Sequence, residues 1–239
     1  MAARGRTRHW RRWLAIGVAA TAVALVGGPY VFIHFIEGTA PSPLALSTPS
    51  SASGAGQTND SGQAAGAAGG TWTVGSDSIV GYRVAEVLFG QSHTAVGRTS
   101  SISGSITIDG ATVTGGGFTV DMATVTSDES RRDAQFKGRI METGTYPTAT
   151  FTLTKPIDLG SLPARGVRRT FRAKGSLTLH GVTRTVTFEL TGQYTGSVVQ
   201  VAGSIPITFA DWNVPNPSFG PVTTQDHGVL EFALNFVSG

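Results

Sequence analysis

Two neighbouring segments with a strict two-residue alternation constrain the fold of this chain most. Apolar or small residues occupy every second position of Phe171–Leu179, and the same pattern returns in Thr185–Leu190. Successive side chains of a strand point to opposite faces, so this period predicts two half-buried strands. The His180-Gly181 pair lies between them, and glycine supplies the positive φ that a tight hairpin turn needs.

The register of this hairpin is restricted although its loop length is open. A two-residue loop pairs Leu179 with Val182, and a four-residue loop pairs Leu179 with Arg184. Both keep the apolar residues of the two strands on one face. A slip of one residue turns Phe188 and Leu190 to the other face and is strongly disfavoured. The hairpin therefore belongs to an antiparallel sheet with one apolar face.

The same alternation recurs through the C-terminal two thirds of the chain. We predict further strands over residues 79–89, 102–109, 112–122, 148–154, 198–209 and 229–237. One segment, Ser127–Met141, breaks the pattern, and Ser127 as N-cap followed by two acidic residues predicts a single short helix there. At least eight strands without a βαβ repeat favour an all-β antiparallel barrel or sandwich. Side chains fill the interior of an eight-stranded barrel or leave room for one small ligand.

The N-terminal third has a different composition. Residues 1–12 form a basic tail with five arginines, and residues 13–36 carry no charged side chain. About 20 apolar residues span a bilayer, whereas a cleaved signal peptide has an apolar core of only about 7–15. We therefore predict a single-pass anchor in the cell membrane over residues 13–36, with the N-terminus cytoplasmic and the C-terminal domain extracytoplasmic. The alternative is a signal peptide cut after Thr39.

Residues 37–70 are rich in Ala, Ser, Gly and Pro, which predicts a disordered linker before a domain over residues 71–239. The positive charge of the chain comes from the basic tail, because residues 71–239 hold 13 basic and 13 acidic side chains. A neutral domain lacks the basic surface of a nucleic-acid-binding protein. The chain has no cysteine, which excludes disulfides and thiolate metal sites.

The polar residues of the domain do not predict catalysis. His93, His180 and His227 lack the spacing of a metal site, and His180 is explained by the turn. Asp226 and His227 with Ser218 suggest a triad, but no nucleophile elbow surrounds Ser218. We expect no enzyme activity, no metal and no cofactor.

Two ordered segments resemble the signatures of the YceI-like family. Arg131–Phe151 has a charged pair, a short helix and a Tyr-Pro turn that leads into a strand, and Val120–Thr126 fits the strand and turn before it. Gly175–Leu190 is similar to the second signature, G-x-L-T-L-x-G-V-T-x-x-V. The resemblance covers residues 71–237, and the segments 88–100 and 211–232 look like a membrane-anchored actinobacterial type of the family.

The resemblance implies a lipocalin-like barrel whose apolar tunnel holds a long-chain isoprenoid or another amphiphilic lipid, without catalysis. Many relatives have a histidine late in the first long strand, where this chain has Glu86 or Val87. Burial of each methylene contributes about 0.8 kcal/mol, so an apolar tube suits such a chain. The strand phases supply these candidates for its lining: Tyr82, Val84, Leu88, Phe118, Val120, Met122, Phe151, Leu153, Leu177, Phe188, Leu190, Ile205, Ile207, Phe232 and Leu234.

Four polar residues are candidates for the mouth of the tunnel. Glu86 is in phase with the apolar positions of its strand, so it requires a partner, and an arginine would serve. Arg132 and Asp133 lie in the predicted helix, as a structural ion pair and cap or as headgroup contacts. Arg184 shares the parity of the apolar face and stands at the rim if the tunnel opens near the hairpin turn.

The sequence leaves the state of the interior open. In the first hypothesis the barrel holds a lipid; in the second it is a structural or interaction module filled by its own side chains. A homodimer also remains open as a partner.

Overall fold

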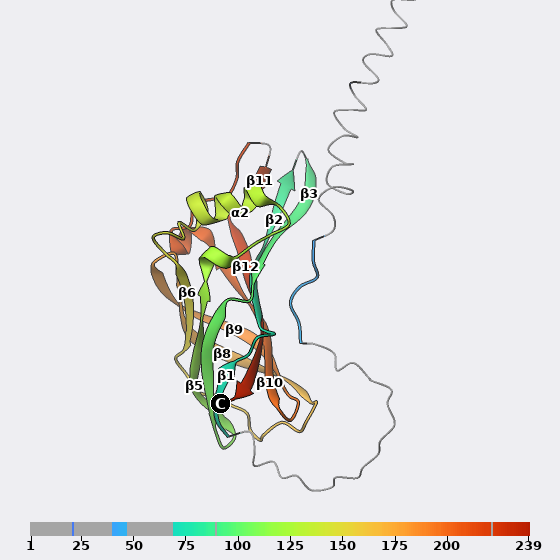
Figure 1. The fold of residues 1–239 in the computed structure, drawn as a ribbon, viewed down its shortest axis with the longest axis vertical. Helices are drawn as coiled ribbons and strands as arrows, with labels where there is room; N and C mark the ends of the chain where they lie inside the picture. Colours follow the sequence, from blue (N-terminus) through green and yellow to red (C-terminus); the bar gives the residue numbers. More distant parts are fainter. Residues whose placement is uncertain (1–20, 22–39, 47–68, 89, 221) are drawn as a thin grey trace, which may run out of the picture.

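The computed structural model describes residues 21, 40–46, 69–88, 90–220 and 222–239 (Figure 1). The predicted basic tail, nearly all of the predicted membrane anchor and most of the predicted linker lie outside these residues. Among the described residues, no helix has the length and apolar character to span a bilayer.

Eight antiparallel strands close into a barrel, which the family resemblance implied and which was one of the two architectures that the strand pattern favoured. The barrel closes because β1 pairs with β4 on one edge and with the end of β12 on the other. Its strands in spatial order are β1 (Gly70–Val74), β4 (Ile102–Asp109), β5 (Thr112–Asp121), β6 (Thr148–Leu153), β8 (Arg168–Leu179), β9 (Val182–Tyr194), β10 (Val198–Thr208) and β12 (His227–Ser238).

Further strands extend the wall beyond β1. β2 (Ile79–Leu88) follows β1 along β12, and β3 (Gln91–Thr99) forms a hairpin with β2. The short β11 (Val222–Thr224) pairs with the end of β2, and β7 (Ile157–Asp158) pairs with β5. The sequence analysis did not predict β1, β3, β7 or β11. β3 has no two-residue alternation, because Ala95, Val96 and Gly97 are buried in succession.

The helical segment differs in detail from the prediction. Helix α2 spans Ser130–Gln135 and continues as a π-helical turn, η3 (Phe136–Ile140). The carboxylate of Glu129, not Ser127, caps the helix by accepting from the N–H of Arg131. Ser127 instead donates its hydroxyl to Asp133. The π-helical turn holds two buried residues, Phe136 and Ile140.

The central hairpin has the shorter of the two predicted loops. Leu179 pairs with Val182, and His180 and Gly181 both have positive φ, 49° and 73°. This is the two-residue turn whose twist matches that of the strands. The ring of His180 is buried and faces the carbonyl of Trp212 at 3.3 Å and the carboxylate of Glu142 at 3.2 Å.

Gly181→Ala is expected to destabilise the protein by about 1–3 kcal/mol. The new Cβ would lie 2.5 Å from the ring of Tyr146, in a backbone conformation that alanine rarely adopts. Urea denaturation measures the loss. Gly110→Ala is the matched control, because Gly110 also has positive φ but no atom within 4 Å of the added Cβ. A loss no larger than that of the control would contradict the contact with Tyr146.

A segment of the predicted linker contacts the barrel. Residues 40–46, which we call the strap, run along the outside of the wall and are the blue segment of Figure 1. Arg83 and Arg98 donate to the carbonyls of Pro41 and Ser42, and the side chain of Leu46 is buried. These seven residues lie within the segment that the sequence predicts to be a linker.

Candidate functional site: the barrel interior

A cavity of about 470 Å³ occupies the half of the barrel that α2 and η3 cover. This volume lies within the range of about 300–1,000 Å³ that is usual for small-ligand sites. Eleven of the predicted lining residues border it: Tyr82, Val84, Leu88, Phe118, Val120, Met122, Phe151, Leu177, Ile205, Ile207 and Phe232. The two-residue alternation of these strands thus directs most of the predicted lining residues to one largely apolar cavity.

A second cavity of about 120 Å³ lies in the other half of the barrel. Of the four predicted lining residues absent from the larger cavity, Leu153, Leu190 and Leu234 border this one. Its volume is below the usual range for a ligand site. Phe118, Phe151 and Phe232 border both cavities and therefore separate them.

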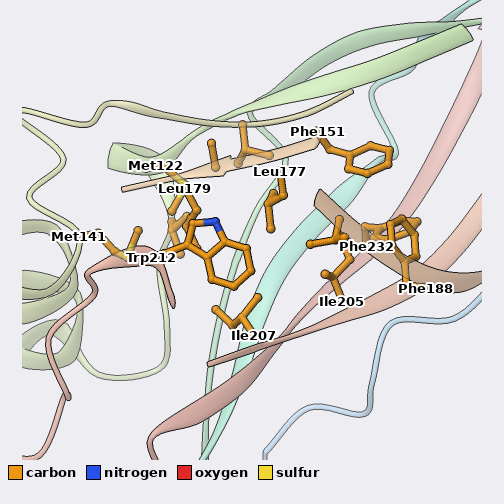
Figure 2. Close-up of a cluster of buried hydrophobic side chains, with 14 of the residues drawn as sticks. Met122, Met141, Phe151, Leu177, Leu179, Phe188, Ile205, Ile207, Trp212 and Phe232 are labelled. Carbon is orange, nitrogen blue, oxygen red and sulfur yellow. The ribbon is translucent and has the colours of Figure 1, made fainter. Parts of the chain in front are cut away.

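Four phenylalanines fill the middle of the barrel, and we call them the phenylalanine cluster: Phe118, Phe151, Phe188 and Phe232. Phe151 and Phe188 have ring centroids 5.3 Å apart, and the other three ring pairs lie at 5.7–5.8 Å. Figure 2 shows Phe151, Phe188 and Phe232 at one side of the buried side chains. Phe188 borders neither cavity, because the other rings and the wall enclose it. The interior is thus open in one half and filled at the middle.

The sequence analysis missed several residues that border the larger cavity in the half of the barrel covered by α2 and η3, which we call the wide end. Phe136, Ile140 and Met141 follow α2 and border the larger cavity, and Phe209 and Val214 border it from the segment after β10. Trp212 and Met141 lie near one another at the opposite side of Figure 2 from the phenylalanine cluster. Met141 is buried, whereas Ala134 earlier in the same helical segment is exposed. An α-helical period could not find the buried residues, because the segment is partly π-helical.

Two of the four predicted mouth residues meet at the larger cavity. The carboxylate of Glu86, 9% exposed, lies 3.3 Å from Nη2 of Arg132, and Arg132 also pairs with Asp128. His93, directly across the ladder from Glu86, has its Nε2 at 4.0 Å from the carboxylate. Both Glu86 and Arg132 border the cavity. A charge pair therefore lies in a wall that is mostly apolar but also carries Glu129, Arg131, Gln135 and Glu231.

The structure does not bring the other two predicted mouth residues to the cavity. Asp133 accepts hydrogen bonds from the backbone N–H and the hydroxyl of Ser127, at 2.8 and 2.7 Å, so it has the structural role of a cap. Arg184 is half exposed and pairs with Asp211 at 3.5 Å. The carbonyl of Asp211 and the ring of Trp212 also hold its guanidinium, which keeps it away from the apolar space.

The remaining candidates of a catalytic triad have local partners. Ser218 accepts a hydrogen bond at its hydroxyl from the N–H of Thr224, and the exposed His227 contacts Asp226 at 2.8 Å. The hydrogen bond with His227 lowers the pKa of Asp226. Within the part of the chain that the structure describes, no three His, Asp or Glu side chains gather as metal ligands would.

The hydroxyl of Tyr82 lies in a part of the wide end that is poorly exposed to water. Its ring stacks on Phe136 at a centroid distance of 5.1 Å, and burial raises the pKa of its hydroxyl well above the usual value. The unfolded chain ionises this tyrosine near pH 10, whereas the folded chain keeps it neutral. The contribution to stability is therefore complete below pH 10 and is lost as the pH rises toward the folded pKa.

Tyr82→Phe is expected to remove this alkaline loss. Above about pH 10 the wild-type free energy of unfolding should fall by up to about 1.4 kcal/mol per pH unit more than that of the variant. Denaturation curves of both proteins between pH 8 and 11 measure the difference, with the titration of lysines common to both. Parallel curves would show that Tyr82 ionises as freely in the folded protein as in the unfolded chain.

Comparisons with known proteins agree with this architecture. The family model of the YceI-like domain matches residues 72–236. A polyisoprenoid-binding domain from Saccharophagus degradans, implicated in plant cell wall breakdown, is 19% identical with a TM-score of 0.58, covering 71% of this chain and 98% of that one. Burkholderia cenocepacia BcnA is 24% identical with a TM-score of 0.50, covering 64% of this chain and 95% of its own. Among curated proteins, no sequence match was found.

The match covers most of the chain and all strands of the barrel except the ends of the first and last. It includes both signature segments, the α2 segment and the β8–β9 hairpin, at the positions that the sequence analysis gave them. The chain belongs to the YceI-like domain family.

Proposed function

We propose that the protein is a non-enzymatic, membrane-anchored, extracytoplasmic lipid-binding protein that holds a polyisoprenoid or a similar amphiphile in its barrel. The observation that carries the proposal is the apolar cavity of about 470 Å³ with the Glu86–Arg132 pair in its wall. The fold shared with the Saccharophagus degradans domain supports an isoprenoid as the cargo. The uncharged residues 13–36 support the membrane anchor.

The mechanism follows from the chemistry of the walls. A hydrocarbon chain that enters the cavity loses contact with water, and each buried methylene contributes about 0.8 kcal/mol to its retention. The charged pair cannot be buried under hydrocarbon without cost, so it orients the polar end of the ligand toward itself. Arg132 supplies N–H donors to an oxygen-bearing headgroup, and Glu86 holds the guanidinium in place.

The test is native mass spectrometry of the full chain extracted from membranes. We expect a copurified lipid that Val84→Phe displaces, because Val84 is buried at the larger cavity and the added ring would fill it. Ala85→Phe is the matched control, since the adjacent side chain is exposed on the other face of β2. Repeated absence of any lipid from the wild type, together with no uptake of added polyprenols, would contradict the proposal.

A ligand-free structural module is the second candidate, and the phenylalanine cluster that fills the middle of the barrel favours it. In that case neither the wild type nor Val84→Phe should carry a copurified lipid in native mass spectra. A homodimer stays a prediction, which analytical ultracentrifugation of the solubilised chain tests.

A further inference from the structure

The strap has a direction along the barrel. Its start, Pro41 and Ser42, binds Arg83 and Arg98 beside the larger cavity, where the neighbouring Gly81 borders that cavity. Its end, Leu46, accepts from Arg168, whose Nε bonds to Gln193 at 3.0 Å. Gln193 borders the smaller cavity. The chain therefore runs from the wide, α2-covered half toward the narrow half, and its upstream end points to the wide half.

We infer that the strap orients the barrel so that the wide end, with the mouth of the larger cavity, faces the membrane. The inference rests on the proposed anchor over residues 13–36. Pro41 lies only five positions after Ile36, the last residue of that span. Fully extended, five residues reach at most about 18 Å.

This reach decides between the two ends of the barrel. From Arg83 to Leu88 at the wide end, β2 advances five residues, which is about 17 Å. Toward the narrow end, β12 runs nine residues from Val229, the partner of Arg83, to Ser238, which is about 30 Å. The connection between Ile36 and Pro41 is long enough to bring the wide end to the bilayer surface, but it is too short to bring the narrow end there.

The rim of the wide end carries an apolar surface that suits a lipid bilayer. Phe219 is 64% exposed, more than any other large apolar residue that the structure describes, and it borders the larger cavity. Phe219 bridges to Val222, which pairs with Leu88, and the exposed Val87 lies next to Leu88. An aromatic side chain at this rim is placed to enter the interface between lipid and water. A lipid could then pass from the bilayer into the cavity without crossing water.

The experiment uses the absence of native cysteine. Ser130→Cys labels the start of α2 at the wide end, and Ser197→Cys labels the β9–β10 turn at the narrow end; both serines are exposed. Each full-length variant, with a fluorophore on its cysteine, is placed in nanodiscs of phosphatidylcholine and phosphatidylglycerol that carry a headgroup spin label. We expect several-fold stronger quenching at position 130 than at 197. Equal quenching, or stronger quenching at 197, would overturn the inference.

A second variant tests whether the short connection to the anchor sets the orientation, or whether the barrel surface alone prefers that orientation on the bilayer. A flexible Gly/Ser insert as long as the barrel, placed between Thr39 and Ala40, should abolish most of the difference between the two labels. An unchanged difference would show that the short connection does not set the orientation. Loss of the protein from membranes in an alkaline wash would overturn the anchor and this inference together. Asymmetric quenching without a copurified lipid would overturn the proposed cargo alone.

Discussion

Phe118→Ala is expected to join the two cavities of the barrel and to shift the copurified lipids toward longer chains. The ring of Phe118 borders both cavities and lies 5.7 Å from Phe151 and 5.8 Å from Phe232. Its removal opens a passage from the larger space into the smaller one, so a hydrocarbon chain can continue past the middle of the barrel. Truncation of a fully buried phenylalanine costs about 3–5 kcal/mol, and we expect the lower end because Phe118 is only partly buried and borders both cavities.

Native mass spectrometry and urea denaturation measure the two effects of this substitution separately. Phe188→Ala is the control within the same cluster, because Phe188 is buried but borders neither cavity. It should lose about 3–5 kcal/mol of stability with little change in the length of the bound lipid. If Phe118→Ala leaves the lipid profile unchanged while it destabilises the fold, the phenylalanine cluster does not limit the length of the ligand.

The lining of the barrel could be predicted from the sequence because a strand has a fixed period. Once Phe188 and Leu190 are assigned to one face, the pleat assigns every second residue of the hairpin to that face. All predicted lining residues except Phe188 accordingly border a cavity. The period cannot distinguish a residue at a cavity from one in a filled cluster, because both point inward. Phe118 and Phe188 both point inward, but Phe118 borders both cavities whereas Phe188 borders neither.

The partner of a polar residue could be predicted from the sequence only where the residue is a buried charge that requires an opposite charge beside it. Glu86 is in phase with apolar neighbours, and a buried carboxylate requires a cation, which Arg132 supplies. Arg184 also had the correct parity, but its partner Asp211 lies in a separate turn that no local pattern connects to the hairpin. The strap was missed for the same reason. Its composition is that of a linker, and its contacts are made to residues far away in the sequence.

A buried ion cluster under the strap provides the other large effect. Glu231 is 3% exposed, and its carboxylate lies 3.0 Å from Arg98, 3.5 Å from Arg83 and 3.1 Å from the N–H of Leu44. Sequence periodicity places Glu231 opposite in parity to the inward-facing Phe232, on the outer face of β12. The strap and the two arginines contribute to its burial, and Glu231 also borders the larger cavity.

The double variant Arg83→Ala with Arg98→Ala is expected to destabilise the protein by about 3–5 kcal/mol, because it leaves a carboxylate buried without its cations. It should also release the strap, since both arginines hold carbonyls of that segment. Urea denaturation gives the first effect, and hydrogen exchange at Leu44, whose N–H is bonded to Glu231, gives the second.

Adding Glu231→Leu to the double variant distinguishes the cost of the unpaired carboxylate from the loss of the hydrogen bonds that hold the strap. Replacing a buried ion cluster with apolar residues is often neutral, so the triple variant should recover most of the lost stability. It should not recover the strap, because the bond from Leu44 and both arginine bonds are absent. Recovery of both would mean that the strap is held by its apolar contacts at Leu46. Recovery of neither would mean that the arginines stabilise β2 and β3 through contacts other than the carboxylate.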